Sequence, residues 1–217
     1  MLALLRSPMS SRPPNPSLIY RSPLVYRLTM AVLYGRYYRA RTRSVAALVP
    51  SGASVLELCC GPGTLYLGYL RGKHVRYRGL DLNPVVVRRL RDLGVDADVA
   101  DVSAAPLPPA DIVLMQASLY HFIADARALI DRMRAAACKT VIVSEPVRNL
   151  ATSQRPLVAW LAARSASPGD RRHADRFTEA SLDALMASYG DAVRDRRLIP
   201  GGRDKIYVLR GSAEAGS

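Results

Sequence analysis

The chain has 217 residues, of which 49% are hydrophobic and 23% charged, as is ordinary for one globular domain with a full core. No run approaches the roughly 18 apolar residues of a membrane span. The three cysteines have neither metal-ligand spacing nor the even number of a disulfide framework. We therefore expect a protein of the reducing cytoplasm that binds no metal.

The positive charge is concentrated at the N-terminus. The net charge is +13, and the stretch before Glu57 contains eight arginines and no acidic residue. Five tyrosines, from Tyr20 to Tyr38, are interleaved with these arginines. Such a stretch is typical of a solvated helix face, of an anionic membrane surface, or of an RNA surface where arginine meets phosphate and tyrosine stacks on bases. Charge alone does not choose among the three.

Composition divides the chain into three parts. Residues 1–17 are rich in Arg, Ser and Pro and are predicted to be a disordered tail. Residues 18–50 are predicted to form a basic, Tyr-rich helical extension or lid, because Leu24, Leu28 and Val32 recur at helical spacing before Pro50. Residues 51–211 are predicted to form the main domain, with residues 147–177 as an insertion that shapes a substrate pocket.

Strand and helix signals alternate along the main domain. This alternation is typical of right-handed βαβ units and a parallel sheet covered on both faces. Residues 193–199 and 205–209 are two further strands without a helix between them, so we expect an antiparallel hairpin at the C-terminus. The other predicted strands are 54–58, 75–80, 97–100, 112–115 and 140–144, and the predicted helices are 65–71 and three that begin after Asn83, Asp125 and Thr178.

The first predicted strand runs into a glycine-rich turn that contains Gly61 and Gly63. Glycine has no Cβ and tolerates positive φ, so backbone N–H groups in such a turn can approach a ligand closely. Asp81 ends the second predicted strand, twenty residues after Gly61. A carboxylate at that place can accept both hydroxyls of a ribose. The two features together predict a site for a nucleoside-containing cofactor.

These landmarks and their order resemble the class I S-adenosylmethionine-dependent methyltransferases over about residues 45–210. Residues 57–63 are similar to the family's first motif and residues 110–116 to its fourth-strand motif. The resemblance implies an α/β fold, namely a Rossmann-like, doubly wound, mostly parallel seven-stranded sheet that ends in an antiparallel hairpin. It also implies S-adenosyl-L-methionine as the cofactor. The cofactor-binding residues that it implies are Glu57, Cys59, Gly61, Gly63, Asp81, Leu82, Asp101, Val102 and Gln116.

Each implied role has a simpler structural alternative. The resemblance implies that Glu57 helps to hold the cofactor's amino group and that Asp101, with the next backbone N–H, meets the adenine. If the resemblance is set aside, Glu57 is a partner of the turn or of a helix dipole, and Asp101 is a helix N-cap. Many family members have glycine where Cys59 stands. The rival cofactor is NAD(P), but its fingerprint needs a third glycine where this chain has Tyr66.

The site for the methyl acceptor is expected after the fourth and fifth strands, at the carboxyl edge of the sheet where ligands bind in such folds. His121 is a candidate general base because imidazole titrates near neutrality, and Tyr120 is a second catalytic candidate. Packing or capping is the simpler alternative for both residues. The candidate substrate contacts are Ser118, Glu145 and Trp160.

The sequence therefore predicts an S-adenosylmethionine-dependent methyltransferase that acts on a small, hydrophobic or lipid-like molecule. Residues 116–119 are not the Asn/Asp-Pro-Pro-aromatic tetrapeptide of the adenine and amide N-methyltransferases of this fold. Two alternatives stay open, an RNA methyltransferase that uses the basic N-terminal region and a catalytically silent cofactor-binding subunit. We expect a cytoplasmic protein, with peripheral contact to an anionic membrane as a further option.

Overall fold

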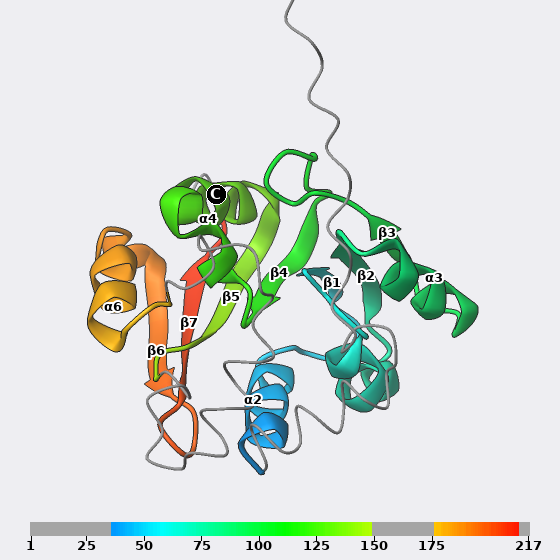
Figure 1. Cartoon of the computed structure of the whole chain (residues 1–217), viewed down its shortest axis with the longest axis horizontal. Coiled ribbons are helices and arrows are strands. Elements are labelled where there is room, and N and C mark those ends of the chain that lie inside the picture. The colour runs from blue at the N-terminus through cyan, green and yellow to red at the C-terminus, as the bar shows by residue number, and fades with distance from the viewer. Residues whose placement is uncertain (1–35, 149–175, 213–217) are drawn as a thin grey trace, which may run out of the picture.

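The computed structural model describes residues 36–148 and 176–212. Its centre is one seven-stranded sheet with the order β3-β2-β1-β4-β5-β7-β6. Neighbours among β1 to β5 pair in parallel, whereas β7 runs antiparallel to both β5 and β6 (Figure 1). The predicted mostly parallel sheet with a closing hairpin is confirmed. The strands are β1 (Ser54–Leu58), β2 (Arg76–Asp81), β3 (Ala97–Val99), β4 (Ala110–Gln116), β5 (Ala137–Pro146), β6 (Val193–Leu198) and β7 (Asp204–Arg210).

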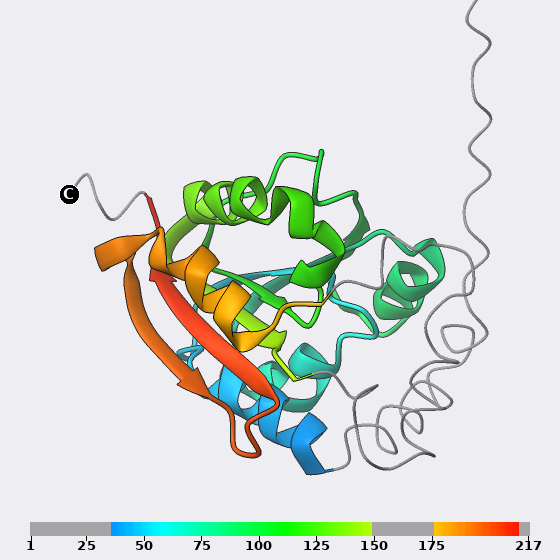
Figure 2. The same cartoon turned by 60° about the vertical axis from the view of Figure 1, so that its left-hand side comes forward.

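Helices cover both faces of the sheet and bury two apolar clusters. Figure 2 shows α4 (Ala126–Ala136) and α6 (Glu179–Ala187) on one side and α2 (Arg36–Ala47) on the other. The first cluster joins α4 and α6 to inward residues of the central strands, and the second joins α2 and α3 (Pro84–Asp92) to the opposite face. β4 is buried on both sides, which explains its continuous apolar run.

Two helix starts follow directly from their sequences. The Asn83 side chain accepts a hydrogen bond from the Val85 backbone N–H, and Pro84 occupies the first helical position of α3. Thr178 and Ser181 form a reciprocal capping box at the start of α6. These caps fix where each helix leaves the carboxyl edge of the sheet.

Two connections differ from the prediction. The expected helix over residues 65–71 is a π-helical segment, Tyr66–Leu70, followed by a 3-10 turn, Arg71–Lys73. Gly68 and Gly72 lie within these few residues, and glycine is a weak helix former. Residues 119–125, for which no element was predicted, form the 3-10 segment η4 (Leu119–Asp125). Asp125 stands at the start of α4 as expected, but its side chain makes no capping hydrogen bond.

The basic helix α2 is fixed to the sheet by a buried ion pair. Arg41 is only 4% exposed, and its Nη1 lies 3.3 Å from Oδ1 of Asp204 on β7. Val45 on α2 packs into the same apolar cluster as Ile206 of β7. At least one of the eight N-terminal arginines therefore belongs to the core rather than to a solvated surface. The predicted tail and residues 18–35 of the predicted extension lie outside the described residues, and no helix within the described ranges is long and apolar enough to cross a membrane.

We expect Asp204→Ala to lower the free energy of unfolding by about 3 kcal/mol, because it leaves the Arg41 guanidinium buried without this carboxylate. Urea denaturation at neutral pH measures the change. The matched control is Asp195→Ala, which removes the partner of Arg197 in a surface pair on β6 and should cost less than about 1 kcal/mol. Equal losses in the two variants would contradict a structural role for the buried pair.

Candidate cofactor and acceptor site

The glycine-rich turn after β1 leaves space above its backbone. Gly61 and Gly63 have φ values of +52° and +68°, which favour glycine. A Cβ on Gly63 would lie 2.6 Å from Leu90 Cδ2, so this glycine lets α3 pack closely against the turn. A Cβ on Gly61 would meet no atom within 4 Å. The Gly61 position is therefore open to a ligand, whereas the Gly63 position is filled by the fold.

Asp81, at the end of β2, is held by the turn on the neighbouring strand. Its Oδ2 accepts a hydrogen bond of 2.8 Å from Gly61 N–H, and its Oδ1 accepts one of 2.9 Å from Asn83 N–H. Burial raises the pKa of this carboxyl, and the two backbone hydrogen bonds oppose the rise. Leu82 follows directly and is 66% exposed. A fixed carboxylate beside an exposed apolar side chain fits a ribose diol with a flat apolar base next to it.

Glu57 lies beneath the same turn and is 3% exposed. Its Oε2 accepts a hydrogen bond of 2.7 Å from the Tyr77 hydroxyl, and its Oε1 accepts one of 2.9 Å from Gln116 Nε2. Burial raises the pKa of Glu57 to about 7, against the lowering effect of these two donors. The carboxyl group thus links three adjacent strands, because Tyr77 lies near the start of β2, Glu57 lies on β1 and Gln116 lies at the end of β4.

Comparison with known proteins identifies the family of the chain. Residues 32–194 match a family described as a methyltransferase domain. The chain belongs to the class I S-adenosylmethionine-dependent methyltransferases. No curated protein sequence matches it significantly.

Three solved structures illustrate the likeness of this methyltransferase to others of the same fold. Magnesium protoporphyrin IX methyltransferase of Synechocystis PCC 6803 with bound S-adenosylhomocysteine is 15% identical, with a TM-score of 0.63 over 86% of this chain and 93% of that one. A Haloferax volcanii methyltransferase, described as putative and in complex with the activator Trm112, is 14% identical, with a TM-score of 0.62 over 86% and 93%. A family 2 O-methyltransferase of Planctomyces limnophilus with apigenin is 17% identical, with a TM-score of 0.59 over 86% and 60%.

The residues present fit the cofactor of the family, S-adenosylmethionine. The open position at Gly61, the fixed Asp81 carboxylate and the buried Glu57 carboxyl lie together at the carboxyl ends of β1 and β2. Among the described residues, no group of three or more His, Cys, Asp or Glu side chains could hold a metal ion. The assignment of individual cofactor contacts stays a prediction.

The remaining predicted cofactor residues occupy two settings. Asp101 is exposed, and its Oδ1 accepts hydrogen bonds from the backbone N–H and hydroxyl of Ser103, which lower the pKa of Asp101. It therefore caps a turn after β3, and because no helix follows this turn the simpler alternative of a helix N-cap is wrong. Val102 is buried at 3% exposure. Cys59, beside Gly61, is half-buried, and burial raises the pKa of its thiol to about 12, so this thiol is inert at neutral pH.

Glu145, a predicted substrate contact, is a fully buried carboxyl at the end of β5. Its Oε2 accepts hydrogen bonds of 3.1 and 3.0 Å from the backbone N–H groups of Ser118 and Leu119, whereas its Oε1 has no hydrogen-bond partner among the described residues. Burial raises the pKa of Glu145 to about 8, although nearby Arg41 and Arg176 lower it. At neutral pH this carboxyl is therefore mainly protonated and can donate as well as accept.

The two catalytic candidates lie on η4. Tyr120 is half-buried and His121 exposed, and their rings are 3.9 Å apart. The Arg176 guanidinium lies 3.3 Å from the centre of the Tyr120 ring, a cation–π contact. The structure thus brings Ser118, Tyr120 and Glu145 to one edge of the sheet, while Trp160 lies outside the described residues.

Sequence reasoning missed two features of this edge. Cys59 and Ala117, at the ends of adjacent strands β1 and β4, have positive φ values of 53° and 47°, which are strained for residues with a Cβ. Tyr77 was not singled out although it meets Glu57. A signal was present, since Tyr77 and Gly79 precede Asp81 at alternate positions of one strand and therefore point to the same face.

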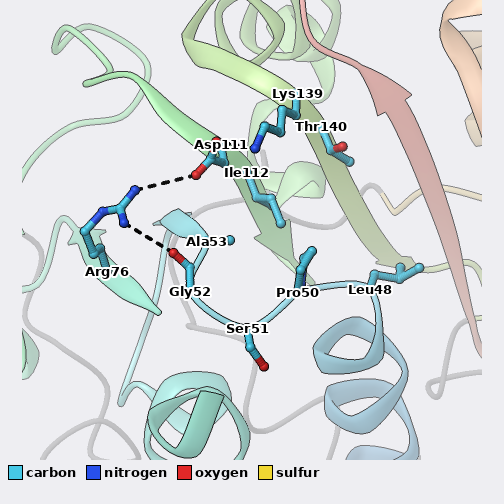
Figure 3. Close-up of a pocket in the computed structure, with 10 residues that line it drawn as sticks. All are labelled: Leu48, Pro50, Ser51, Gly52, Ala53, Arg76, Asp111, Ile112, Lys139 and Thr140. Carbon is cyan, nitrogen blue, oxygen red and sulfur yellow. Dashed lines mark hydrogen bonds and ion pairs between the residues drawn. The ribbon is translucent and has the colours of Figure 1, made fainter. Parts of the chain in front are cut away.

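A separate cavity lies at the opposite edge, where β1, β2, β4 and β5 begin (Figure 3). Its volume is about 470 Å³. Asp111 accepts hydrogen bonds from the backbone N–H and hydroxyl of Ser54, and Lys139 and Arg76 lie 3.0 and 3.8 Å from its carboxylate. These contacts tie the strand starts together. Ligands in open α/β sheets bind at the other edge, so we assign this region a structural role.

Gly61→Ala and Gly52→Ala form a matched pair that separates ligand approach from backbone strain. Both glycines have positive φ, +52° and +76°, and a Cβ on either would meet no atom within 4 Å. Each substitution should therefore cost about 1 kcal/mol of stability. Only Gly61→Ala should weaken the binding of S-adenosylhomocysteine, by about tenfold or more, as measured by calorimetric titration. Equal affinity in the two variants would contradict cofactor approach at Gly61.

Proposed function

We propose that this methyltransferase transfers the methyl group of S-adenosylmethionine to a small, hydrophobic or lipid-like molecule in the cytoplasm. The observation that carries the proposal is the buried Glu145 carboxyl beside the ends of β4 and β5. Burial raises the pKa of this carboxyl, so it places little negative charge at this edge and can offer a hydrogen bond to an uncharged acceptor. The fold neighbours with protoporphyrin and apigenin in their descriptions act on or bind small molecules, which adds support.

Methyl transfer requires little covalent chemistry from the protein. S-adenosylmethionine supplies a methyl group on a sulfonium, which is already a strong electrophile. The residues of this chain must fix the donor, align the acceptor and exclude water, and alignment alone has a large effect on rate. Asp81 and Glu57 would hold the cofactor end, and the backbone of Ser118 and Leu119 fixes the Glu145 carboxyl next to the acceptor side.

The base, where the acceptor must lose a proton, has two candidates on the described residues. Glu145 has one oxygen without a hydrogen-bond partner and a pKa raised to about 8, and a base is most effective when its pKa lies near the working pH. His121, the second candidate, is exposed, and its ring lies against that of Tyr120. The burial of Glu145 favours it as the polar contact of an otherwise apolar acceptor.

We expect methyl label from S-adenosylmethionine to pass into an organic-extractable small-molecule fraction and not into RNA. The measurement incubates the purified protein with labelled cofactor and with matched pools of cellular metabolites or total RNA, at about 50 and 200 mM salt. Transfer to a small apolar acceptor should change less than about twofold with salt, whereas RNA binding would weaken by orders of magnitude. Glu145→Leu should reduce transfer by at least about tenfold, while the control Lys139→Ala at the amino edge should not.

Label that enters RNA in a salt-sensitive way would instead support an RNA methyltransferase. Cofactor binding without transfer to either pool would support a catalytically silent subunit. Either result would contradict the proposed acceptor class.

A further inference from the structure

Glu57 is the centre of a hydrogen-bond network that spans three strands. Tyr77 approaches from β2 and occupies Oε2 at 2.7 Å, and Gln116 approaches from β4 and occupies Oε1 at 2.9 Å. The two partners differ in burial. The Tyr77 ring is 7% exposed and stacks on Tyr66 with a centroid distance of 4.4 Å, whereas Gln116 is only half-buried at the open end of its strand. Oε2 of Glu57 is thus held by a buried side chain, and Oε1 by a side chain at the open end of β4.

The contact between Tyr77 and Glu57 depends on the glycine at position 79. In the sheet register, Glu57 on β1 lies opposite Gly79 on β2. Tyr77 is two residues earlier on β2 and points to the same face, so its hydroxyl must pass over Gly79 to reach Glu57. A Cβ on Gly79 would lie 3.1 Å from that hydroxyl and 2.8 Å from Cys60 Sγ. Tyr77 and Gly79 together therefore form a route by which the hydroxyl reaches a carboxylate on the next strand.

We propose that Tyr77 is a positioning residue for cofactor binding, whose hydroxyl fixes Oε2 of Glu57 so that Oε1 can exchange the Gln116 amide for the ammonium group of the cofactor. A phenylalanine would fill the same volume but would leave Oε2 without this donor. Tyr77 itself is covered by Tyr66 and does not need to touch the cofactor. Its effect is transmitted through the orientation and the charge state of Glu57.

The network also makes cofactor binding depend on pH. The ammonium group is bound by the ionised carboxylate, so below about pH 7, where Glu57 is mainly protonated, binding must release a proton to solvent. Apparent affinity should then fall about tenfold for each pH unit below 7. We call this fall of affinity with falling pH the acid limb. The Tyr77 hydroxyl lowers the pKa of Glu57, so removal of the hydroxyl moves the acid limb to higher pH. The other titratable groups that face Glu57 are Asp81 from β2 and the thiols of Cys59 and Cys60 from the turn.

Calorimetric titration with S-adenosylhomocysteine between pH 5.5 and 7.5 tests the proposal on the full chain. Tyr77→Phe should move the acid limb upward by about one pH unit, so that affinity falls about tenfold at pH 6 and clearly less at pH 7.5. Tyr66→Phe is the matched control, because it removes a hydroxyl from the stacked ring and leaves both hydrogen bonds of Glu57 in place. It should change affinity by less than about twofold at every pH.

The double variant separates positioning from packing. In a Glu57→Gln background the carboxylate is gone, so Tyr77→Phe should produce no further shift of the acid limb. Any pH dependence left in that background comes from groups other than Glu57, of which Asp81 is the nearest carboxyl named above. An equal loss of affinity at all pH values, no loss at all, or the same loss in the Glu57→Gln background would overturn the proposal. Failure of the parent protein to bind S-adenosylhomocysteine would overturn the cofactor assignment as well, whereas binding without the shift would overturn only the role of Tyr77.

Discussion

The hydrogen bond from Gly61 N–H to the Asp81 carboxylate is the contact on which the proposed cofactor site depends. It joins the turn after β1 to the end of β2, two strands that pair in parallel. The bond fixes the ribose-binding carboxylate relative to the open backbone position at Gly61. Asn83 holds the other oxygen of the same carboxylate and also caps α3. One side chain thus couples the turn, the strand and the next helix.

Two further carboxyl groups are buried close to the same edge. Glu57 lies under the turn, and Glu145 lies at the end of β5. A buried carboxyl is costly when charged, so each has a raised pKa and each is fixed by donors on neighbouring segments. The pair Arg41–Asp204 attaches the basic helix α2 to β7, next to β5 in the sheet. The desolvation cost is thus concentrated where donor and acceptor are proposed to meet.

Sequence reasoning recovered what is local. The strand before Gly61, the Asn83 cap and the C-terminal hairpin, whose connection contains Pro200, depend on neighbouring residues, and the structure shows all three. It missed the contact of Tyr77 with Glu57, which the register of β1 and β2 creates, and the ion pair of Arg41, which the packing of α2 on the sheet creates. The 3-10 segment η4 was missed because seven residues are too few for apolar spacing to distinguish a helical segment from a loop. The roles of individual cofactor and acceptor residues stay predictions.

Calorimetric titration of the parent protein with S-adenosylhomocysteine and with NADH tests the central claim most directly. The account predicts saturable binding of S-adenosylhomocysteine at a single site and no binding of NADH. It also predicts that Asp81→Ala loses most of the affinity, because this substitution removes the carboxylate that accepts the hydrogen bond from Gly61. Binding of NADH in its place, or equal affinity for S-adenosylhomocysteine in the parent and in Asp81→Ala, would contradict it.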